Sequence, residues 1–262
     1  MSKYEEKTIL ITGASSGIGK AIAFDFAKKN VKKIIMVARS KSKLDQVYEE
    51  LKNICEAEVY SCDISIKESV SKMKNEIEKK DKIDVLINNA GFGIFGSVKD
   101  QTIEDIESVM ATNYFGMIYC IKNFLPSMMK NRSGHIINIA SLAASFGIPM
   151  MAPYCASKYA MLGFSESLYY ELKGTGVKVT VISPIAVKTN FFNNQSFNNK
   201  FVHKFGYVLD PRKVSKAVIN SINSPRFEIT VPFFVRGAVW LKHTIPFIIN
   251  PIIDKSFKKY MP

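Results

Sequence analysis

The segment TILIT at residues 8–12 runs directly into GASSGIG at residues 13–19. It predicts a short buried strand, a glycine turn and the start of a helix. Glycines at such a junction permit a tight turn and let the backbone approach a phosphate group. The spacing G-x3-G-x-G is neither the G-x-G-x-x-G fingerprint nor a P-loop, which needs G-K-S/T. An ordinary glycine-rich turn is the alternative interpretation.

Six further short apolar or β-branched runs follow along the chain of 262 residues, with helical patterns between them. Runs without polar alternation are typical of strands that are covered on both faces. We therefore predict an α/β fold, a single domain with a doubly wound parallel sheet of about seven strands. The predicted strands are Thr8–Thr12, Lys33–Ala38, Glu58–Cys62, Val85–Asn88, His135–Ala140, Lys178–Ser183 and Glu228–Val231.

The ends of the next three strands carry residues that suit a dinucleotide. The second ends in Ala38, Arg39 and Ser40, where an NAD site would place a carboxylate. A guanidinium and a hydroxyl suit a 2′-phosphate instead, so we predict a preference for NADP(H), with NAD(H) as the alternative. Asp63 follows the third strand as an adenine partner or a helix cap, a role for which Ser65 competes. NNAG at residues 88–91 ends the fourth strand.

A second group of polar residues suggests acid–base chemistry. Tyr154 and Lys158 are four residues apart in the helical stretch PYCASKYAM, which places them on one helix face. An ammonium one turn away should lower the pKa of a phenol, which is about 10 in water. Ser141 ends a strand, so its hydroxyl can hold a substrate oxygen. Asn113 is a further polar residue in an apolar helical run.

Taken together, these motifs resemble those of the short-chain dehydrogenases/reductases over residues 5–231. The resemblance implies a Rossmann-like fold with Tyr154 as general acid/base and Ser141 positioning a carbonyl. It also implies that Lys158 binds the nicotinamide ribose and that Asn113 holds a water in a proton relay. The expected reaction is reduction of a ketone or aldehyde, or oxidation of a secondary alcohol. A non-catalytic dinucleotide-binding sensor or scaffold is the alternative.

The same resemblance implies the cofactor-binding set. Its members are Gly13, Ser15, Ser16, Gly17, Ile18, Gly19, Arg39, Ser40, Asp63, Ile64, Asn89, Ala90, Gly91, Tyr154, Lys158, Pro184, Val187 and Thr189. One departure concerns Ile185, which stands where the family has a glycine. A β-branched residue adopts a positive φ only at high cost, so either this turn keeps a negative φ or the nicotinamide pocket is reshaped.

The net charge of +13 is compatible with nucleic acid, an anionic membrane, a polyanionic ligand or a lysine-rich composition without functional meaning. No nucleic-acid-binding motif is present, so we expect no nucleic-acid partner. The charged N-terminus predicts no signal peptide and a cytoplasmic protein. Cys55, Cys62 and Cys120 are expected to be buried thiols, and we give Cys155 no role. The scattered His135, His203 and His243 predict no metal site.

Two segments interrupt the strand–helix alternation. Residues 189–210, rich in Asn and Phe, are expected to form an insertion on the substrate side. Residues 232–262 form an apolar tail with basic residues, too interrupted for a transmembrane helix. Contact with a membrane surface, a lid over a lipophilic substrate and a dimer interface are the three interpretations. From the family we also expect a homodimer or homotetramer acting on a small-molecule carbonyl or alcohol.

Overall fold

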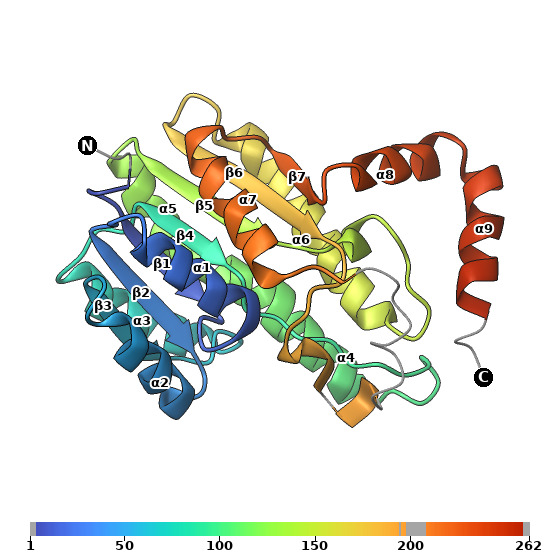
Figure 1. Ribbon diagram of the computed structural model, residues 1–262, viewed down its shortest axis with the longest axis horizontal. Helices are drawn as coiled ribbons and strands as arrows, with labels where there is room; N and C mark the ends of the chain where they lie inside the picture. Colours follow the sequence, from blue (N-terminus) through green and yellow to red (C-terminus); the bar gives the residue numbers. More distant parts are fainter. Residues whose placement is uncertain (1–3, 194, 198–207, 259–262) are drawn as a thin grey trace.

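The computed structural model describes residues 4–193, 195–197 and 208–258, and in it seven parallel strands form one sheet (Figure 1). The order across the sheet is β3-β2-β1-β4-β5-β6-β7. The strands are β1 (Thr8–Thr12), β2 (Lys33–Ala38), β3 (Ala57–Ser61), β4 (Val85–Asn88), β5 (Gly134–Ile139), β6 (Val177–Pro184) and β7 (Glu228–Val231). The predicted single-domain, doubly wound sheet is confirmed.

Four predicted strands, β1, β2, β4 and β7, have the predicted bounds. The other three differ from the prediction by one residue at both ends. Pairing with the neighbouring strand decides these ends: Ala57 pairs with Ile34, and Gly134 pairs with Val177. Such pairs are made across the sheet, so the local sequence pattern does not mark them.

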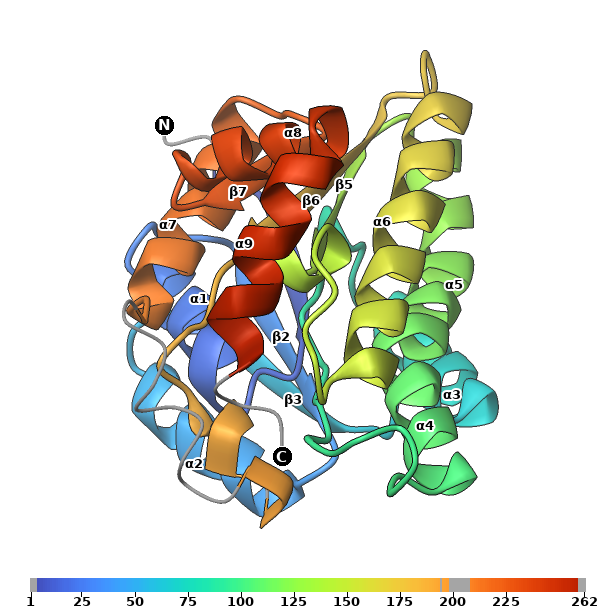
Figure 2. The ribbon, with the colours of Figure 1, turned by 90° about the vertical axis from the view of Figure 1, so that its right-hand side faces the viewer.

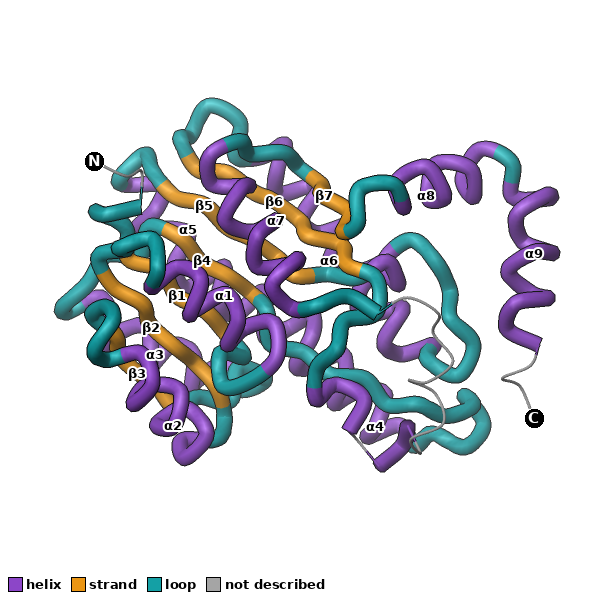
Figure 3. Tube along the Cα trace, viewed as in Figure 1, coloured by secondary structure: helices purple, strands orange, loops and turns teal. Residues whose placement is uncertain are grey.

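Helices cover both faces of the sheet (Figure 3). One apolar core joins α1, α2 and α7 to the sheet, and the other joins it to α3, α5 and α6. The helices on the first face are α1 (Gly17–Ala27), α2 (Lys41–Leu51) and α7 (Pro211–Asn223). Those on the second are α3 (Lys67–Glu78), α4 (Ile103–Met110), α5 (Gly116–Lys130) and α6 (Ala152–Glu171).

The order of the strands reverses between β1 and β4, which lie side by side although five elements separate them in the chain. From β1 the chain proceeds outward to β2 and β3, and from β4 it proceeds the other way to β7. The connections therefore leave β1 and β4 on opposite sides, which opens a crevice at their carboxyl ends. The residues that follow β1, β4 and β5 all lie at this edge.

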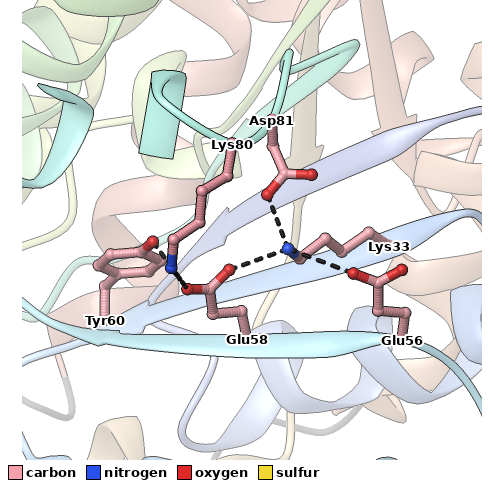
Figure 4. Close-up of polar contacts among 6 residues, drawn as sticks. All are labelled: Lys33, Glu56, Glu58, Tyr60, Lys80 and Asp81. Atoms are coloured by element: carbon pink, nitrogen blue, oxygen red, sulfur yellow. Dashed lines mark hydrogen bonds and ion pairs between the residues drawn. The ribbon is translucent and has the colours of Figure 1, made fainter. Parts of the chain in front are cut away.

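The opposite edge of the sheet carries a buried charge. The Lys33 side chain, 8% exposed, contacts Asp81 at 2.6 Å, Glu58 at 2.9 Å and Glu56 at 3.3 Å (Figure 4). Burial lowers the pKa of Lys33, but these carboxylates outweigh it and raise that pKa. Burial likewise raises the pKa of Glu58, and hydrogen bonds from Lys33, Lys80 and Tyr60 outweigh it and hold it at about 2. The cluster joins β2, β3 and the loop after α3.

The tail forms two helices, α8 (Val235–Thr244) and α9 (Pro246–Lys258). Helix α8 leads away from the end of β7, and α9 stands apart from the body of the fold (Figure 1). Figure 2, which views the protein from that side, shows α9 in front of the rest of the fold. No residue of α8 is buried. Within the described ranges, no helix has the length and hydropathy needed to span a bilayer.

The expected insertion at residues 189–210 is described only in part. Two short 3₁₀ turns, η3 (Asn190–Asn193) and η4 (Gln195–Phe197), follow β6 at its carboxyl end. Residue 194 and residues 198–207, with His203 among them, lie outside the described residues.

The cysteines are free thiols. Cys62, Cys120 and Cys155 are buried, but the prediction for Cys55 was wrong, because it is half-buried. Cys55 follows the end of α2 in the turn to β3, where it packs only against the edge of the core.

We expect the Glu58→Gln substitution to lower the free energy of unfolding by about 2 to 3 kcal/mol at pH 7. The pKa of Glu58 is about 2 in the folded protein, against 4.5 for an ordinary glutamate, as in the unfolded chain. The ionised carboxylate therefore stabilises the fold above pH 4.5. This stabilisation is lost as the pH falls from 4.5 towards 2, so the difference from the wild type should shrink at pH 3.

Urea unfolding at pH 7 and pH 3 measures this effect. The control is Asp45→Asn, which removes the exposed Lys41–Asp45 pair and should cost under about 1 kcal/mol. Equal losses for the two variants at pH 7 would contradict the role of the buried cluster.

Candidate active site

The turn after β1 has no room for a side chain at its glycine positions. Gly13 and Gly17 have φ angles of +66° and +54°, which L-residues with side chains rarely adopt. A Cβ on Gly19 would lie 2.3 Å from the carbonyl oxygen of Gly13, and one on Gly13 would lie 2.8 Å from Ala90 Cα. The glycines therefore allow α1 to start directly against the turn and the turn to lie against the chain after β4.

Polar contacts fix the turn in this position. Asn89 Nδ2 donates to the carbonyl oxygens of Thr12 at 2.9 Å and Gly13 at 3.2 Å. In return, the hydroxyl of Thr12 accepts from the backbone amides of Asn89 at 3.0 Å and Ala90 at 3.1 Å. Asn89 thus orders the turn through its side chain.

The turn fits an anionic group. Ser16 is the N-cap of α1, yet its side chain makes no capping hydrogen bond, and the first turn of α1 contains no acidic residue. The amide groups at this end therefore remain available, and the helix dipole favours negative charge there. A pyrophosphate lying against glycine backbone matches these features.

A cleft of about 650 Å³ runs from this turn across the carboxyl ends of the strands. The predicted residues that line it are Gly13, Ser15, Ser16, Gly17, Ile18, Arg39, Ser40, Asp63, Ile64, Asn89, Ala90, Gly91, Tyr154, Lys158 and Thr189. Five predicted residues lie outside its lining: Gly19, Pro184, Val187, Ser141 and Asn113. Gly19 packs behind the turn, whereas Pro184, Val187 and Asn113 are buried.

Sequence analysis missed several residues of the cleft wall. They are Val37, Ala38, Lys43, Cys62, Phe92, Thr112, Ile139, Ala140, Asn190, Phe191 and Asn193. Two signals could have found some of them. Lys43 lies one turn after Ser40 at the start of α2, and Phe191 belongs to the Asn- and Phe-rich segment. The remaining residues enter the cleft through folding alone.

At the β2 end of the cleft, Arg39 is exposed and lies beside Ser40 and Lys43. Ser40 caps α2, because its hydroxyl accepts from the amide of Lys43 at 3.5 Å. Neither Asp63 nor Ser65 caps α3, whose N-cap is Ile66. Instead Asp63 Oδ1 accepts from the amide of Ser65 at 3.0 Å and from its hydroxyl at 2.7 Å.

At the other end, Tyr154 and Lys158 lie on the first turns of α6, as the spacing predicted. The Lys158 ammonium lies 5.7 Å from the centre of the Tyr154 ring and donates to the Ile139 carbonyl oxygen at 2.9 Å. Ser141 starts the 3₁₀ turn η2 (Leu142–Ala144), and its side chain hydrogen-bonds to that of Tyr154. The fold therefore brings these three side chains together from the start of η2, which follows β5, and from α6.

The direction of the Tyr154 pKa differs from the expectation. Burial raises that pKa to about 12, which the hydrogen bond with Ser141 opposes. Burial also lowers the pKa of Lys158 to about 7. Both charged forms are disfavoured for one reason, because each side chain has lost its water. At neutral pH, the phenol is therefore protonated.

Asn113 lies behind these residues, in a π-helical turn, η1 (Ala111–Phe115), between α4 and α5. Its side chain donates to the Phe92 carbonyl oxygen at 2.9 Å and to Ser157 Oγ at 3.0 Å, and accepts from the Phe92 amide at 2.9 Å. Asn113 therefore connects the loop after β4 to α6, beside Lys158. A local π turn of this kind often marks a functional site.

The turn after β6 keeps an ordinary backbone. Ile185 is not among the positive-φ residues of the described chain, so this turn keeps a negative φ, which was the first of the two alternatives for this position. Its amide donates to the Val231 carbonyl oxygen at 3.0 Å, and its side chain packs against the core. Thr189 lines the cleft opposite Gly17 and accepts from the Phe191 amide at 3.3 Å.

An aromatic cluster borders the Tyr154 end of the cleft. The Phe191 ring packs edge-on against the Tyr154 ring, with centroids 5.3 Å apart. Phe192 and Phe197 pack against Phe191 in turn, and Phe95 against Phe197. The cluster makes this side of the site apolar.

Comparison with known proteins places these features in a wider group. A family model described as "short chain dehydrogenase" matches residues 7–200. The chain is 31% identical to 3-ketodihydrosphingosine reductase of Dictyostelium discoideum, with 87% of this chain and 75% of that protein covered. It is 30% identical to epidermal retinol dehydrogenase 2 of Mus musculus, with 91% and 78% covered.

Solved structures agree. A short-chain dehydrogenase/reductase from Burkholderia phymatum in complex with NAD superposes with a TM-score of 0.85 at 25% identity, covering 93% of this chain and 95% of that one. A short-chain dehydrogenase from Sphingobium yanoikuyae in complex with NADPH gives 0.82 at 25% identity, covering 92% and 94%.

Proposed function

Since the chain belongs to the short-chain dehydrogenases/reductases, we propose that it is an NADP(H)-dependent oxidoreductase that reduces a lipophilic ketone or aldehyde to the alcohol. The observation that carries this proposal is the placement of Tyr154 in the same cleft as the glycine turn, hydrogen-bonded to Ser141 and near Lys158. One end of the cleft fits a pyrophosphate, and the other holds a protonated acid.

The side chains have separate tasks in this reaction. A bound reduced nicotinamide would supply a hydride to the carbonyl carbon. Tyr154 donates its phenolic proton to the oxygen on which negative charge develops, and Ser141 donates a hydrogen bond to the same oxygen. A tyrosine with a pKa of about 12 is protonated at neutral pH, which favours reduction over oxidation.

Lys158 and Asn113 support Tyr154. The Lys158 ammonium, at the cleft wall, would bind the ribose hydroxyls, and its pKa of about 7 lets it exchange a proton at neutral pH. Asn113 holds the Phe92 backbone and contacts Ser157, next to Lys158, so it can carry a water towards Lys158.

The preference for NADP(H) follows from the end of β2. Arg39, Ser40 and Lys43 line the cleft there, and Ala38 stands in place of a carboxylate. Two cations and a hydroxyl favour a 2′-phosphate over a free ribose hydroxyl. One similar structure was solved with NADPH and another with NAD, so similarity alone does not select the cofactor. The proposed preference for NADP(H) therefore rests on the residues at the end of β2.

An apolar substrate fits the other end of the cleft. Phe191 and Phe192 border Tyr154 with few polar groups, and a polar substrate would lose its hydration there without replacement. Two relatives are named 3-ketodihydrosphingosine reductase and epidermal retinol dehydrogenase 2, and the molecules in both names are lipophilic.

We also propose that the protein is cytoplasmic and contacts an anionic membrane surface through α8 and α9. Phe233, Phe234, Trp240 and Phe247 are 63–74% exposed on this arm. The arm carries more positive than negative charge, because it holds Arg236, Lys242 and Lys255 but only one acidic residue, Asp254. This charge favours an anionic surface. A homodimer or homotetramer remains our expectation from the family.

Replacing Tyr154 by Phe should reduce turnover at least about a hundredfold, because the proton donor is lost, while NADPH binding is retained. Steady-state reduction of a panel of lipophilic ketones and aldehydes, with nicotinamide fluorescence for binding, measures both quantities. Wild-type rates in this variant would exclude Tyr154 as the acid. NADPH binding by the wild type without turnover of any carbonyl would favour the sensor or scaffold.

Replacing Arg39 by Ala should weaken NADPH binding about tenfold or more and leave NADH binding unchanged, because only NADPH carries the phosphate. Fluorescence titration with both cofactors measures this. Lys41→Ala is the matched control, since Lys41 is also exposed but pairs with Asp45. If Arg39→Ala weakens both cofactors equally, the guanidinium does not select the phosphate.

The double substitution Trp240→Ser and Phe247→Ser should reduce binding to vesicles of mixed phosphatidylcholine and phosphatidylserine about tenfold or more, because two exposed aromatic anchors are lost. Flotation of the full-length chain measures this. Val98→Ser with Ile103→Ser is the control, because both side chains are more than 60% exposed elsewhere on the protein. Flotation of the double variant equal to wild type would exclude this contact.

A further inference from the structure

Lys242 makes polar contacts between the tail and the wall of the active site. It lies in the last turn of α8, and its ammonium donates to the carbonyl oxygen of Ser145 and, at 3.0 Å, to the hydroxyl of Tyr159. These partners are 97 and 83 residues away in the sequence. The contact therefore joins segments that are far apart in the sequence.

The two partners belong to the elements that carry the catalytic side chains. Ser145 ends the 3₁₀ turn η2, which begins at Ser141. Tyr159 follows Lys158 on α6, one turn after Tyr154. Lys242 thus connects the turn that carries Ser141 to the helix that carries Tyr154 and Lys158.

Aromatic rings complete the surroundings of the ammonium. It lies 5.0 Å from the centre of the Phe146 ring and 5.8 Å from that of Tyr159. No carboxylate of the described residues lies within 4 Å of it. A half-buried cation between two ring faces and a carbonyl oxygen is held by directed contacts, which fix the position of its partners.

A second contact ties the same loop to α6. The Ile148 amide donates to the Sγ atom of Cys155 at 3.3 Å, and Cys155 directly follows Tyr154 in the sequence. The loop after Ser141 is therefore attached to α6 at two points, through Cys155 and through Lys242. Cys155 lies in the first turn of α6, beside Tyr154, whereas Lys242 lies on α8, in the tail that follows β7.

We infer that Lys242 is a positioning residue that clamps the Ser141 turn against α6 and so sets the distance between the Ser141 and Tyr154 hydroxyls. The inference rests on the proposed function of these two residues. Catalysis needs both hydroxyls at one substrate oxygen, and small displacements of such groups cost large factors in rate. The tail thereby completes the active site without entering it.

Lys242→Met tests this clamp, because it keeps an unbranched side chain and removes the ammonium. We expect kcat to fall about tenfold or more, with KM for the cofactor little changed. Lys242→Arg, which keeps the donor and the contact with the rings, should restore most of kcat. The matched control is Arg236→Met, which removes a cation from the exposed side of the same helix and should leave kcat unchanged.

Hydrogen exchange provides a readout that does not depend on turnover. The amides of Ala143, Ala144 and Ser145 are bonded within the Ser141 turn, and they should exchange faster in Lys242→Met than in the wild type or Arg236→Met. Unchanged exchange would overturn the clamp. Faster exchange with unchanged kcat would overturn the positioning role, as would a kcat loss that Lys242→Arg does not restore.

The two proposals fail in different ways. A wild type that binds NADPH but reduces no carbonyl would overturn the proposed function, whereas the exchange of the three amides would still decide the clamp. A loss of kcat in Lys242→Met with a matching loss in Arg236→Met would point to the charge of the tail and overturn the clamp.

Discussion

The active site depends on the contact between the turn after β1 and the chain after β4. These segments meet because β1 and β4 are neighbours in the sheet, and Asn89 and Thr12 bind each other's backbone where the strands end. The contact leaves no room for a side chain at Gly13 or Gly19. If this approach were lost, the start of α1 would leave the crevice, and the fit for a pyrophosphate would be lost with it.

The chemistry at the far end of the cleft depends on burial. The loss of water raises the pKa of Tyr154 to about 12 and lowers that of Lys158 to about 7, in contrast to the simple picture of an ammonium that lowers the pKa of a phenol. A protonated tyrosine beside a serine hydroxyl suits delivery of a proton to a developing alkoxide. The aromatic cluster around Phe191 provides apolar surroundings, which the proposed proton transfer and an apolar substrate would both require.

Charge has different roles at the two edges of the sheet. At the amino edge, Lys33 lies among three carboxylates, and this cluster joins β2 to β3. At the carboxyl edge, Arg39 and Lys43 face the cleft, with no acidic residue in the first turn of α1. The positive charges of the chain are therefore not equivalent, since Lys33 is paired with carboxylates within the fold, whereas Arg39 and Lys43 line the cleft.

The sequence by itself determined the seven strands, the order of the motifs and the family, because glycine turns, strand ends and helical spacing are local signals. It also placed Tyr154 and Lys158 on one helix face. The tertiary structure alone decided which strands are neighbours, how deeply these two side chains are buried, and that Phe92 and Thr112 line the cleft. It also brought Lys242 to Ser145 and Tyr159, since a contact between residues more than 80 positions apart leaves no local pattern in the chain.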